Sequence, residues 1–474
     1  MECYGQRSIA GGGDDRLSAL PDDILLDIMG NLGVREAGRM AVLSRRWQRL
    51  PGLLPRLVID AREFEPAGLR AGGHARTKRA MERVAGAVES LLPGDRAIER
   101  LRLDVYLLRD ESHTVRRVVE RLNDAVDSGK VAAGGLELVF RATSGGGAPD
   151  QDQPSKRQAR RLTRLLAAAA SPNLLPSVAE LSLVNLRFTP PALASLLGRC
   201  TGLEELGMYQ SDAGFGAVLD VGHARLRRLA VHAGDEAMYK KLRVSSAPRL
   251  ERVVVANWFC RYAPVSFGHV PCLRELHLKN KAVYYQEPVR LSKMLANAPH
   301  LVSLTLGFSS WRIWIEPEAA KQLEPMFSKL KSLVLTGIFR GCDLSWTLFL
   351  LQAAPSLKEF ILEADKPLDA KAPSDIYGEM PKSDDVTWQV PEFQHHHLKH
   401  LEFSGFHEEE MHWRIVELVK ERAANLQSIA LDDGCQGCDV VANEYFLSGG
   451  IKNKKPVLLS VSHKRGSPPI LTLV

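Results

Sequence analysis

The chain has 474 residues, of which 45% are hydrophobic and 25% are charged; these proportions are typical of folded globular proteins and exclude a disordered or fibrous chain. Its length exceeds one ordinary hydrophobic core and suits a small module followed by a large or repetitive domain. The 62 Lys and Arg against 56 Asp and Glu leave a net charge of +6, which is compatible with acidic partners but gives no reason to expect nucleic acid binding.

The cysteines and the N-terminal residues indicate the cellular compartment in which the protein is expected. Seven cysteines are scattered along the chain, and an odd, scattered set predicts reduced thiols in a cytoplasmic or nuclear protein. The opening MECYGQRSIAGGGDDR lacks the apolar segment of a signal peptide, and we expect residues 1–15 to be disordered. The longest apolar stretch, LLAAAASPNLL, is broken at residues 171–173, so we expect neither secretion nor membrane insertion.

Residues 20–50, LPDDILLDIMGNLGVREAGRMAVLSRRWQRL, predict a compact helical module. Pro21 suits the first turn of a helix, and Asp22 and Asp23 lie where the helix dipole favours carboxylates. One stripe of this helix, which Gly33 ends, carries Ile24, Leu25, Ile28 and Leu32. A second helical run extends from Glu36 to Leu43, and a short basic turn follows that carries Trp47 and Leu50.

So small a module can scarcely bury all of these aliphatic side chains internally, so part of its apolar surface should face a partner. An ordinary helical hairpin packed on the following domain is the alternative. The module contains no catalytic chemistry, which favours a protein that works by joining other molecules.

This stretch resembles the F-box. LPDDILLDI is similar to the opening of that family's pattern, and VLSRRWQRL is similar to its close, as in plant F-box proteins with leucine-rich repeats. One departure is Gly33, where the family usually has the Pro of a Leu-Pro pair. The resemblance implies docking on a Skp-type adaptor, and through it on the cullin and RING subunits of a ubiquitin ligase. It also implies an adaptor face that is formed or supported by Leu20, Pro21, Ile24, Ile28, Leu32, Val42, Leu43 and Trp47.

A repeat runs through the remainder of the chain. The pattern L-x-x-L-x-L recurs with first positions at Ile98, Val178, Leu203, Leu226, Leu250, Leu273, Leu301, Leu330, Leu357, Leu398 and Leu426. Its count alone proves nothing, because so loose a pattern arises on the order of ten times by chance. The steps from Val178 onward, however, run 25, 23, 24, 23, 28, 29, 27, 41 and 28 residues, close to the period of leucine-rich repeats, ~20–29 residues.

Other residues keep the same phase as these anchors. Proline precedes the anchor by two positions in five repeats, at Pro176, Pro248, Pro271, Pro299 and Pro355. Helical positions recur ahead of three anchors, at Leu193, Leu196 and Leu197, at Leu291, Met294 and Leu295, and at Leu350 and Leu351. Each unit is therefore predicted to be a short helix, a turn and a strand, whose faces are buried only when units stack.

The fold class that follows is α/β: a small N-terminal helical F-box, then an irregular, curved leucine-rich-repeat solenoid with parallel strands on the concave face and helices on the convex face. A helical array is the alternative, but it would leave the period-2 end of each unit unexplained. The Asn expected after the last Leu is replaced by residues such as Leu186, Ser211, Trp258 and Lys281. The polar stretch 142–158 and the Pro-rich insert 365–391 are predicted to be loops.

Near the C-terminus, residues 397–433 resemble the FBD segment of many plant F-box proteins, with Ser404-Gly405, Glu410, Leu418, Val419, Ala424 and Leu426 at the matching places. The resemblance implies a strand, a glycine turn, an acidic helix and a final strand that closes the array. The expected domains are then the F-box at 16–60, the repeats at 61–434 with the FBD-like part at 390–434, and a tail at 435–474.

Few constellations suggest chemistry. In HEEEMH the histidines at 407 and 412 are five residues apart, about 140° around a helix, so they cannot share a metal as an i, i+4 pair does. Neither the His395, His396, His397 and His400 group nor the Cys435 and Cys438 pair completes a metal spacing. We expect no metal site and no cofactor.

A basic helix face at Lys156, Arg157, Arg160, Arg161 and Arg164 fits phosphate, an acidic partner or an import receptor, or it is simply solvated. There is no phosphate loop, nucleophile elbow or dinucleotide motif.

The sequence therefore predicts a non-catalytic substrate receptor of a cullin-based ubiquitin ligase, in which the F-box docks the adaptor and the solenoid binds one unidentified target protein. Two alternatives stay open. One is a leucine-rich-repeat interaction scaffold outside any ligase, and the other is a hormone-dependent co-receptor of the same architecture.

Overall fold

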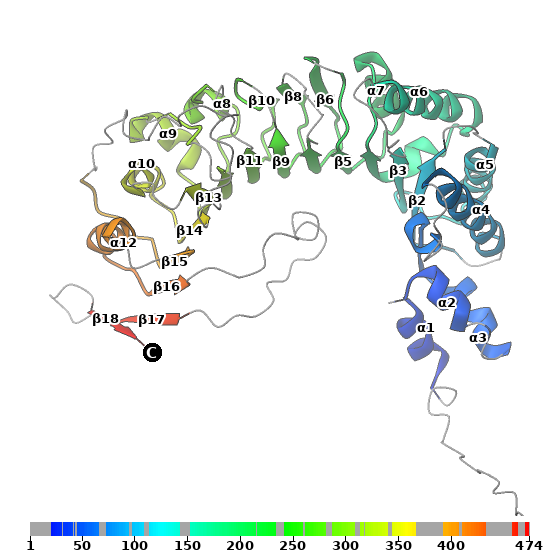
Figure 1. Cartoon of the computed structure of the whole chain (residues 1–474), viewed down its shortest axis with the longest axis horizontal. Coiled ribbons are helices and arrows are strands. Elements are labelled where there is room, and N and C mark those ends of the chain that lie inside the picture. Colours follow the sequence, from blue (N-terminus) through cyan, green and yellow to red (C-terminus); the bar gives the residue numbers. More distant parts are fainter. Residues whose placement is uncertain are drawn as a thin grey trace, which may run out of the picture.

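The structure is a computed structural model, and the parts of the chain that it describes are residues 20–30, 32–40, 42, 45–65, 73–93, 97–108, 113–142, 152–214, 216–233, 241–258, 261–280, 287–308, 313–316, 318–339, 344–365, 392–406, 410–432, 457–462 and 470–473. These parts form an arch with a small helical module below one end (Figure 1). The predicted disordered segment 1–15 lies outside the described residues.

The inner side of the arch is one continuous sheet that begins with thirteen parallel strands. In spatial order they are β1 (Arg56–Asp60), β2 (Arg100–Leu107), β3 (Leu136–Ala142), β4 (Val178–Val184), β5 (Glu205–Tyr209), β7 (Arg228–His232), β9 (Arg252–Trp258), β11 (Glu275–Asn280), β12 (Ser303–Gly307), β13 (Ser332–Phe339), β14 (Glu359–Asp365), β15 (His400–Ser404) and β16 (Ser428–Asp432). The predicted curved solenoid with its strands on the concave face is confirmed.

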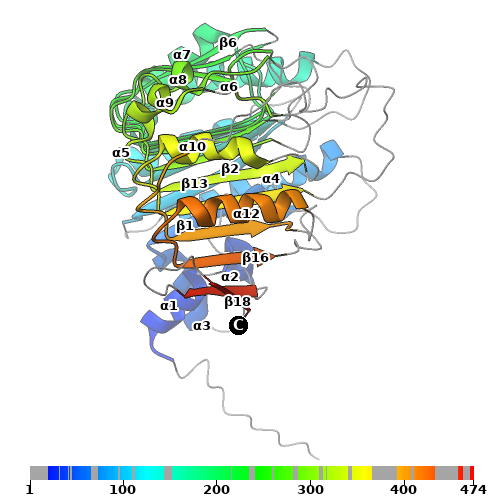
Figure 2. The same ribbon diagram turned by 90° about the vertical axis from the view of Figure 1, so that its left-hand side faces the viewer.

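Helices cover the outer, convex side at both ends of the arch (Figure 1). They are α4 (Gly73–Leu91), α5 (His113–Asp127), α6 (Asp152–Ala169) and α7 (Pro190–Arg199) at one end, and α8 (Leu291–Met294), α9 (Ala320–Phe327), α10 (Leu348–Ala353) and α12 (Glu410–Arg422) at the other. Short 3₁₀ turns complete this layer at η2 (Ala61–Phe64), η3 (Leu175–Ser177) and η4 (Leu344–Thr347). Figure 2 shows α10 and α12 each running beside strands of the C-terminal repeats.

The predicted anchor positions form the spine of the core. All eleven are at most 5% exposed, from Ile98 to Leu426, and most strands begin two residues after their anchor, as β5 does after Leu203. The N–H of Leu250 donates to the Ala247 carbonyl oxygen at 3.0 Å, so Pro248 occupies the second position of a tight turn, where its fixed φ is favoured. The phase read from the sequence is thus confirmed.

Backbone hydrogen bonds join successive repeats just after each anchor. The N–H groups of Arg227 and Arg228 both donate to the carbonyl oxygen of Glu204, at 2.8 and 3.0 Å. Those of Glu251 and Arg252 donate in the same way to Arg227. Since each repeat satisfies the backbone of its neighbour, the units are stable only when stacked.

The predicted helical positions are buried as well. Leu193, Leu196 and Leu197 line the inner face of α7 at 2–4% exposed, and Leu291, Met294 and Leu295 do the same at α8. Leu350 and Leu351 of α10 are fully buried.

The prediction of a helix in every repeat is wrong in the middle of the arch. There a second, three-stranded parallel sheet forms the convex layer, from β6 (Val218–Gly222), β8 (Lys241–Ser246) and β10 (Val265–His269). The repeats in question are those with steps of 23 or 24 residues. An extended return strand needs fewer residues than a helix with its two connections, so the shortest repeats use strands.

Two of the thirteen parallel strands were not predicted, and one predicted loop is partly helical. β1 and β3 lie where the repeat pattern is poor, and β1 falls inside the segment assigned to the F-box. Within the predicted loop 142–158, α6 already begins at Asp152. Asp and Pro in its first turn suit a helix start, a signal that the Gly-rich residues before it obscured.

Ser211 takes over the role of the missing turn Asn in one repeat. Its hydroxyl accepts a hydrogen bond from the N–H of Leu186 at 2.9 Å and donates to the Leu183 carbonyl oxygen at 3.0 Å. Leu186 and Trp258, at the equivalent places, are 1% exposed and fill the turn with apolar volume instead. Lys281 lies outside the described residues.

The layout of the FBD-like segment is confirmed as β15, a glycine turn, α12 and β16. Gly405 has a φ of 72°, and a Cβ there would collide with the Ala364 carbonyl oxygen, so only glycine fits this turn. Beyond it, part of the predicted tail forms β17 (Val457–Ser462) and β18 (Ile470–Leu473), which continue the sheet antiparallel to β16. Most of the Pro-rich insert, residues 366–391, lies outside the described residues.

Candidate functional site

The helical module at the N-terminal end has a small core of its own. It consists of α1 (Asp22–Gly30), α2 (Val34–Met40), α3 (Arg45–Arg49) and the 3₁₀ turn η1 (Leu50–Leu53). The buried side chains that these elements share are Leu25, Met29, Ala37, Trp47, Leu50 and Leu54, each at most 6% exposed. On α1 the inward face is therefore Leu25 and Met29, one turn apart.

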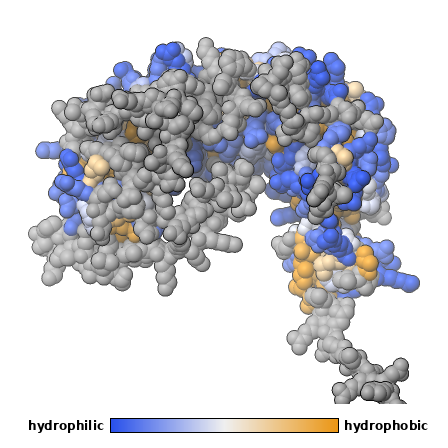
Figure 3. All heavy atoms as spheres, in the orientation of Figure 1, coloured by the Kyte–Doolittle hydropathy of each residue, from blue (hydrophilic) through white to orange (hydrophobic). Residues whose placement is uncertain are grey.

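Leu20, Leu26 and Met40 pack against this core from its edge, whereas several other apolar side chains of the module face outward. Ile24 is 42% exposed and Val42 is 85% exposed. Leu53 of η1 is 36% exposed, and Ile28 and Leu32 are half-buried. In Figure 3 hydrophobic residues gather visibly on this module, unlike on the hydrophilic helices above it. Because the module already has a closed core, these side chains are available to a partner.

Seven of the eight predicted adaptor-face residues are described by the structure, and they divide into three groups. Pro21, Ile24 and Val42 are exposed, whereas Leu20, Ile28 and Leu32 are half-buried at the edge of the module. Trp47 is only 2% exposed, so it holds the helices together from within and offers almost no surface to a partner. Leu43 lies outside the described residues.

Polar contacts fix the module that carries this surface. Arg46 donates to the Asp22 carboxylate at 2.8 Å and to the Leu20 carbonyl oxygen at 2.6 Å, which ties α3 to the start of α1. Arg35 donates to the Glu63 carbonyl oxygen at 2.6 Å and so links α2 to the first repeat. A Cβ at Gly33 would meet the Glu63 carboxylate, which is the end of a flexible side chain and can move aside, so this contact does not by itself require glycine. Sequence reasoning missed these contacts because they join residues 24 or more positions apart.

The concave face of the sheet is the second candidate surface. Residues 205, 207 and 209 alternate with the buried Leu206 and Met208, so the former face the inside of the arch. In register with Glu205 lie Arg228, Arg252 and Glu275. Glu205 pairs with Arg228 and Glu275 with Arg252, so this row holds two pairs of opposite charges, with the two arginines side by side between them.

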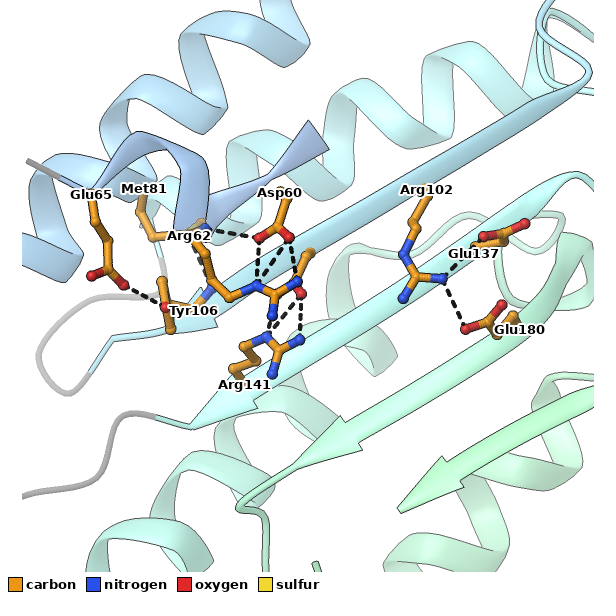
Figure 4. A network of polar contacts seen from close by, with 10 residues as sticks. Asp60, Arg62, Glu65, Met81, Arg102, Tyr106, Glu137, Arg141 and Glu180 are labelled. Carbon is orange, nitrogen blue, oxygen red and sulfur yellow. Dashed lines mark hydrogen bonds and ion pairs between the residues drawn. The ribbon is translucent and has the colours of Figure 1, made fainter. Parts of the chain in front are cut away.

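A polar network covers the first strands of this face (Figure 4). Arg141 pairs with Asp104 at 2.7 Å, and Arg62 pairs with Asp60 at 2.6 Å. Burial alone would raise the pKa of Asp60, but the hydrogen bonds and charge of Arg62 outweigh it and lower that pKa. Burial is stronger at Asp104 and raises its pKa despite Arg141.

Two further groups of contacts complete the network in Figure 4. The Tyr106 hydroxyl donates to Glu65 at 2.5 Å, and burial together with this bond raises the pKa of Tyr106. Arg102 bridges Glu137 at 3.3 Å and Glu180 at 3.1 Å. The charged side chains are thus neutralised by one another and held in place.

The centre of the concave face carries no charged side chain in the middle strands. Its successive positions are Ser182, Gly207, Ala230, Val254 and His277. Burial lowers the pKa of His277 to about 4, with a smaller effect from Arg252, so the imidazole is neutral at physiological pH. Beside this row Tyr209 and His232 pack with ring centroids 5.1 Å apart, and burial lowers the pKa of His232 to about 4. A neutral strip therefore runs along the paired charges.

The histidines considered as metal ligands have other roles. The ring of His395 donates from Nε2 to the Ala354 carbonyl oxygen at 2.9 Å and accepts the N–H of Leu398 at Nδ1 at 3.0 Å. His412 is 1% exposed and packs on Phe403 and Phe406. Among the described residues no three His, Cys, Asp or Glu side chains are placed to hold a metal ion. His407, Cys435 and Cys438 lie outside those residues, and none of the described helices is long and apolar enough to cross a membrane.

Comparisons with known families agree with the two parts of this architecture. Residues 17–56 match the F-box domain. Residues 163–451, more than half of the chain, match the leucine-rich-repeat domain described as At1g61320/AtMIF1. The chain belongs to the plant F-box proteins with leucine-rich repeats.

Individual relatives carry the same combination in their names. The F-box/FBD/LRR-repeat protein At3g52680 of Arabidopsis thaliana is 25% identical over 257 residues, which cover 53% of this chain and 54% of that protein. The F-box/FBD/LRR-repeat protein At5g53840 of the same plant is 40% identical over 63 residues, 13% of this chain and 14% of the relative. The MEIOTIC F-BOX protein MOF of Oryza sativa subsp. japonica is 48% identical over 54 residues, 11% of each chain. The similarity thus spans about half the length of the first relative and less of the others.

Proposed function

We propose that this chain is the substrate-recognition subunit of an SCF-type ubiquitin ligase. The F-box would dock a Skp-type adaptor, and through it the cullin and RING subunits, while the solenoid binds a target protein. The observation that carries the proposal is the exposed apolar surface of a module whose own core is closed, with Ile24 at 42% and Val42 at 85% exposed.

An adaptor would gain its affinity from these outward side chains. Each aliphatic side chain buried on docking contributes ~1–3 kcal/mol, and a few such anchors dominate most protein interfaces. We assign the contacts to Leu20, Pro21, Ile24, Ile28, Leu32, Val42 and Leu43, and we assign Trp47 the role of support from the core. Since β1 pairs with β2, we place the end of the docking module just before Arg56.

The concave face suits a target protein because its charged side chains are already paired. Partners held by ion pairs, such as Arg102 with Glu137 and Glu180, need little reordering when a target binds, which lowers the entropic cost of association. A neutral strip edged by paired charges also has the layout of an interface core and rim. The chain itself would not catalyse the transfer. It raises the effective concentration of the target beside a ubiquitin-conjugating enzyme, in the cytoplasm or nucleus.

The test is co-purification of the full chain with a Skp-type adaptor, using the double change Ile24→Asp and Val42→Asp. Two carboxylates in an apolar contact would lose their water without gaining a partner, so we expect binding to fall by at least about a hundredfold. Far-UV circular dichroism should not change, because both side chains face outward. The control is Tyr262→Asp, which alters a side chain that is 50% exposed in the middle of the solenoid, and it should bind like the wild type.

The outcomes separate the alternatives. A wild-type chain that does not bind the adaptor would contradict the proposal and favour an interaction scaffold outside any ligase. Equal binding by the wild type and the double variant would move the docking site elsewhere. A target that binds only when a small molecule is added would assign the chain to the hormone-dependent co-receptors.

A further inference from the structure

The positive charge of this protein is concentrated on three neighbouring helices. α4, α5 and α6 together carry twelve Lys and Arg against six Asp and Glu, a net charge of +6, which equals the net charge of the whole chain. The rest of the protein is therefore neutral overall. These helices lie side by side on the convex side of the arch, with α4 and α5 at the end above the F-box and α6 at the top beside α7 (Figure 1).

The most concentrated part of this charge is one face of α6. Arg157, Arg160, Arg161 and Arg164 are all exposed, while Gln158, Ala159, Leu162, Leu165 and Leu166 face the core. The spacing places the four guanidinium groups within about 100° of arc and ~10 Å of helix length. They form four like-charge pairs at i, i+3 and i, i+4, each of which destabilises an isolated helix.

Many exposed arginines of the strands are paired with carboxylates, but these four are not paired with any carboxylate of the described residues. Elsewhere exposed arginines pair across the strands, as Arg227 does with Glu251 at 3.1 Å and Arg243 with Asp220 at 2.6 Å. Among the described residues, no hydrogen bond or ion pair engages a guanidinium group of the α6 face. The adjoining helix α7 has no acidic residue either. A concentrated and unneutralised guanidinium surface is suited to an anionic partner.

A small apolar cleft opens beside this face. It is lined by Leu107, Leu108 and Val115 on one side and by Leu162 and Leu165 of α6 on the other, with Arg161 among the lining residues. The cleft is small, about 20 Å³, so it would admit only the terminal methyl groups of an aliphatic side chain, and the residues beside that side chain would then lie close to Arg161. Interfaces commonly combine such an apolar anchor with a charged rim.

The surroundings favour an acidic polypeptide over the other anionic partners. The exposed large hydrophobic residues of the described chain are elsewhere, so α4 to α7 offer nothing to insert into a membrane. The three helices contain no Phe, Tyr or Trp for stacking on bases. Exposed Glu82 and Glu120 on the flanking helices would repel a phosphate backbone laid across the group, whereas a short peptide needs only α6 and the cleft.

We propose that the α6 face, Arg157, Arg160, Arg161 and Arg164 with the adjoining cleft, is a second protein-docking surface that binds an acidic segment carrying an apolar side chain. The proposal is independent of adaptor docking, because α6 belongs to the repeats and the surface shares no residue with the F-box. A protein held there would leave both the F-box and the concave face free.

The test is fluorescence anisotropy of the full chain with a short, labelled peptide of Asp and Glu around one central Leu. We expect saturable binding that weakens as salt is added, and that weakens at least about tenfold in the double variant Arg157→Glu and Arg161→Glu. The matched control is Arg249→Glu with Arg414→Glu, which changes two exposed arginines outside the α4–α6 group by the same total charge, and it should bind within about twofold of the wild type.

Three outcomes would overturn the proposal. Equal weakening in both double variants would show that the peptide responds to net charge alone. Tighter binding of duplex DNA or of phosphatidylserine vesicles than of the peptide, with loss in the α6 variant, would assign the surface to those partners. Full affinity for a peptide with Ser in place of the central Leu would remove the cleft from the site.

Discussion

At the scale of single residues, Ile24 and Leu25 are adjacent in sequence but have opposite surroundings. Leu25 is fully buried and Ile24 is 42% exposed. The sequence placed both on one apolar stripe, since the hydrophobic pattern of a short helix does not reveal which edge of the stripe faces the core. The tertiary structure decides it, because Leu25 and Met29 of α1 share a buried cluster with Trp47 and Leu50. The predicted adaptor face is thus a mixture of contact and supporting residues that only the tertiary structure can separate.

The first prediction concerns Trp47. Trp47→Ala should destabilise the F-box by about 3–5 kcal/mol, because it empties the centre of a core with only six buried side chains. Limited proteolysis between residues 20 and 54 and thermal unfolding would measure it. Trp413→Ala is the control, since that indole is 37% exposed, and it should leave the F-box as resistant as in the wild type. An F-box that stays intact after Trp47→Ala would contradict the packing described.

A second prediction concerns pH. Burial lowers the pKa of His395, with smaller effects from His396 and His397, so the folded state favours the neutral ring that bonds Ala354 and Leu398. The unfolded chain takes up the proton first, near the ordinary His pKa of about 6.5. Stability is therefore highest above that pH and falls as the pH is lowered below it. The same arrangement recurs at His223, whose ring contacts the Cys200 carbonyl oxygen at 3.0 Å.

Thermal unfolding at pH 7.5 and pH 5.5 would test this. The wild type should unfold at a lower temperature at pH 5.5, and the double variant His223→Gln and His395→Gln should show a smaller difference between the two pH values. An exposed histidine, His113, provides the control as His113→Gln. An equally large difference in the double variant would assign the pH dependence to other groups, such as His232 and His277.

At the scale of elements, ion pairs join side chains on neighbouring strands, and these pairs form only when the repeats stack. Arg141 and Asp104 lie on neighbouring strands and are 21% and 3% exposed, whereas Arg243 and Asp220 of the convex sheet are 57% and 37% exposed. The geometry of the two pairs is similar, but the surrounding water differs. Desolvation makes a broken buried pair costly and leaves an exposed one nearly neutral.

The third prediction follows from that contrast. Arg141→Gln should destabilise the protein by about 3 kcal/mol, because Asp104 stays buried without its partner. Adding Asp104→Asn should recover much of the loss. The matching change Arg243→Gln should leave the unfolding midpoint unchanged in urea. A double variant no more stable than Arg141→Gln alone would contradict the role given to the buried carboxylate.

At the scale of the whole molecule, the sequence predicted the repeat and its phase but not its two ends or its middle. The anchors from Val178 to Leu426 could be read because their spacing is regular and Pro248 or Pro355 marks the turn. β3 was not predicted because Gly134 and Gly135 occupy the positions where an apolar anchor residue would precede the strand. β17 and β18 were not predicted because they are antiparallel and do not follow the repeat pattern. The strands β6, β8 and β10 form because their repeats are too short for a helix. The hydrophobic pattern alone does not show that a repeat returns through a strand.

The whole molecule therefore presents three separate surfaces: the outward residues of the F-box, the concave sheet and the α6 face. The central claim is that the adaptor occupies the first and leaves the second open to a target. Amide hydrogen exchange of the full chain with and without a Skp-type adaptor tests it most directly. Protection gained within residues 20–54, with unchanged exchange in β4 to β13, is the predicted result. Protection that appears on the concave strands, or its absence from α1 and η1, would contradict the account.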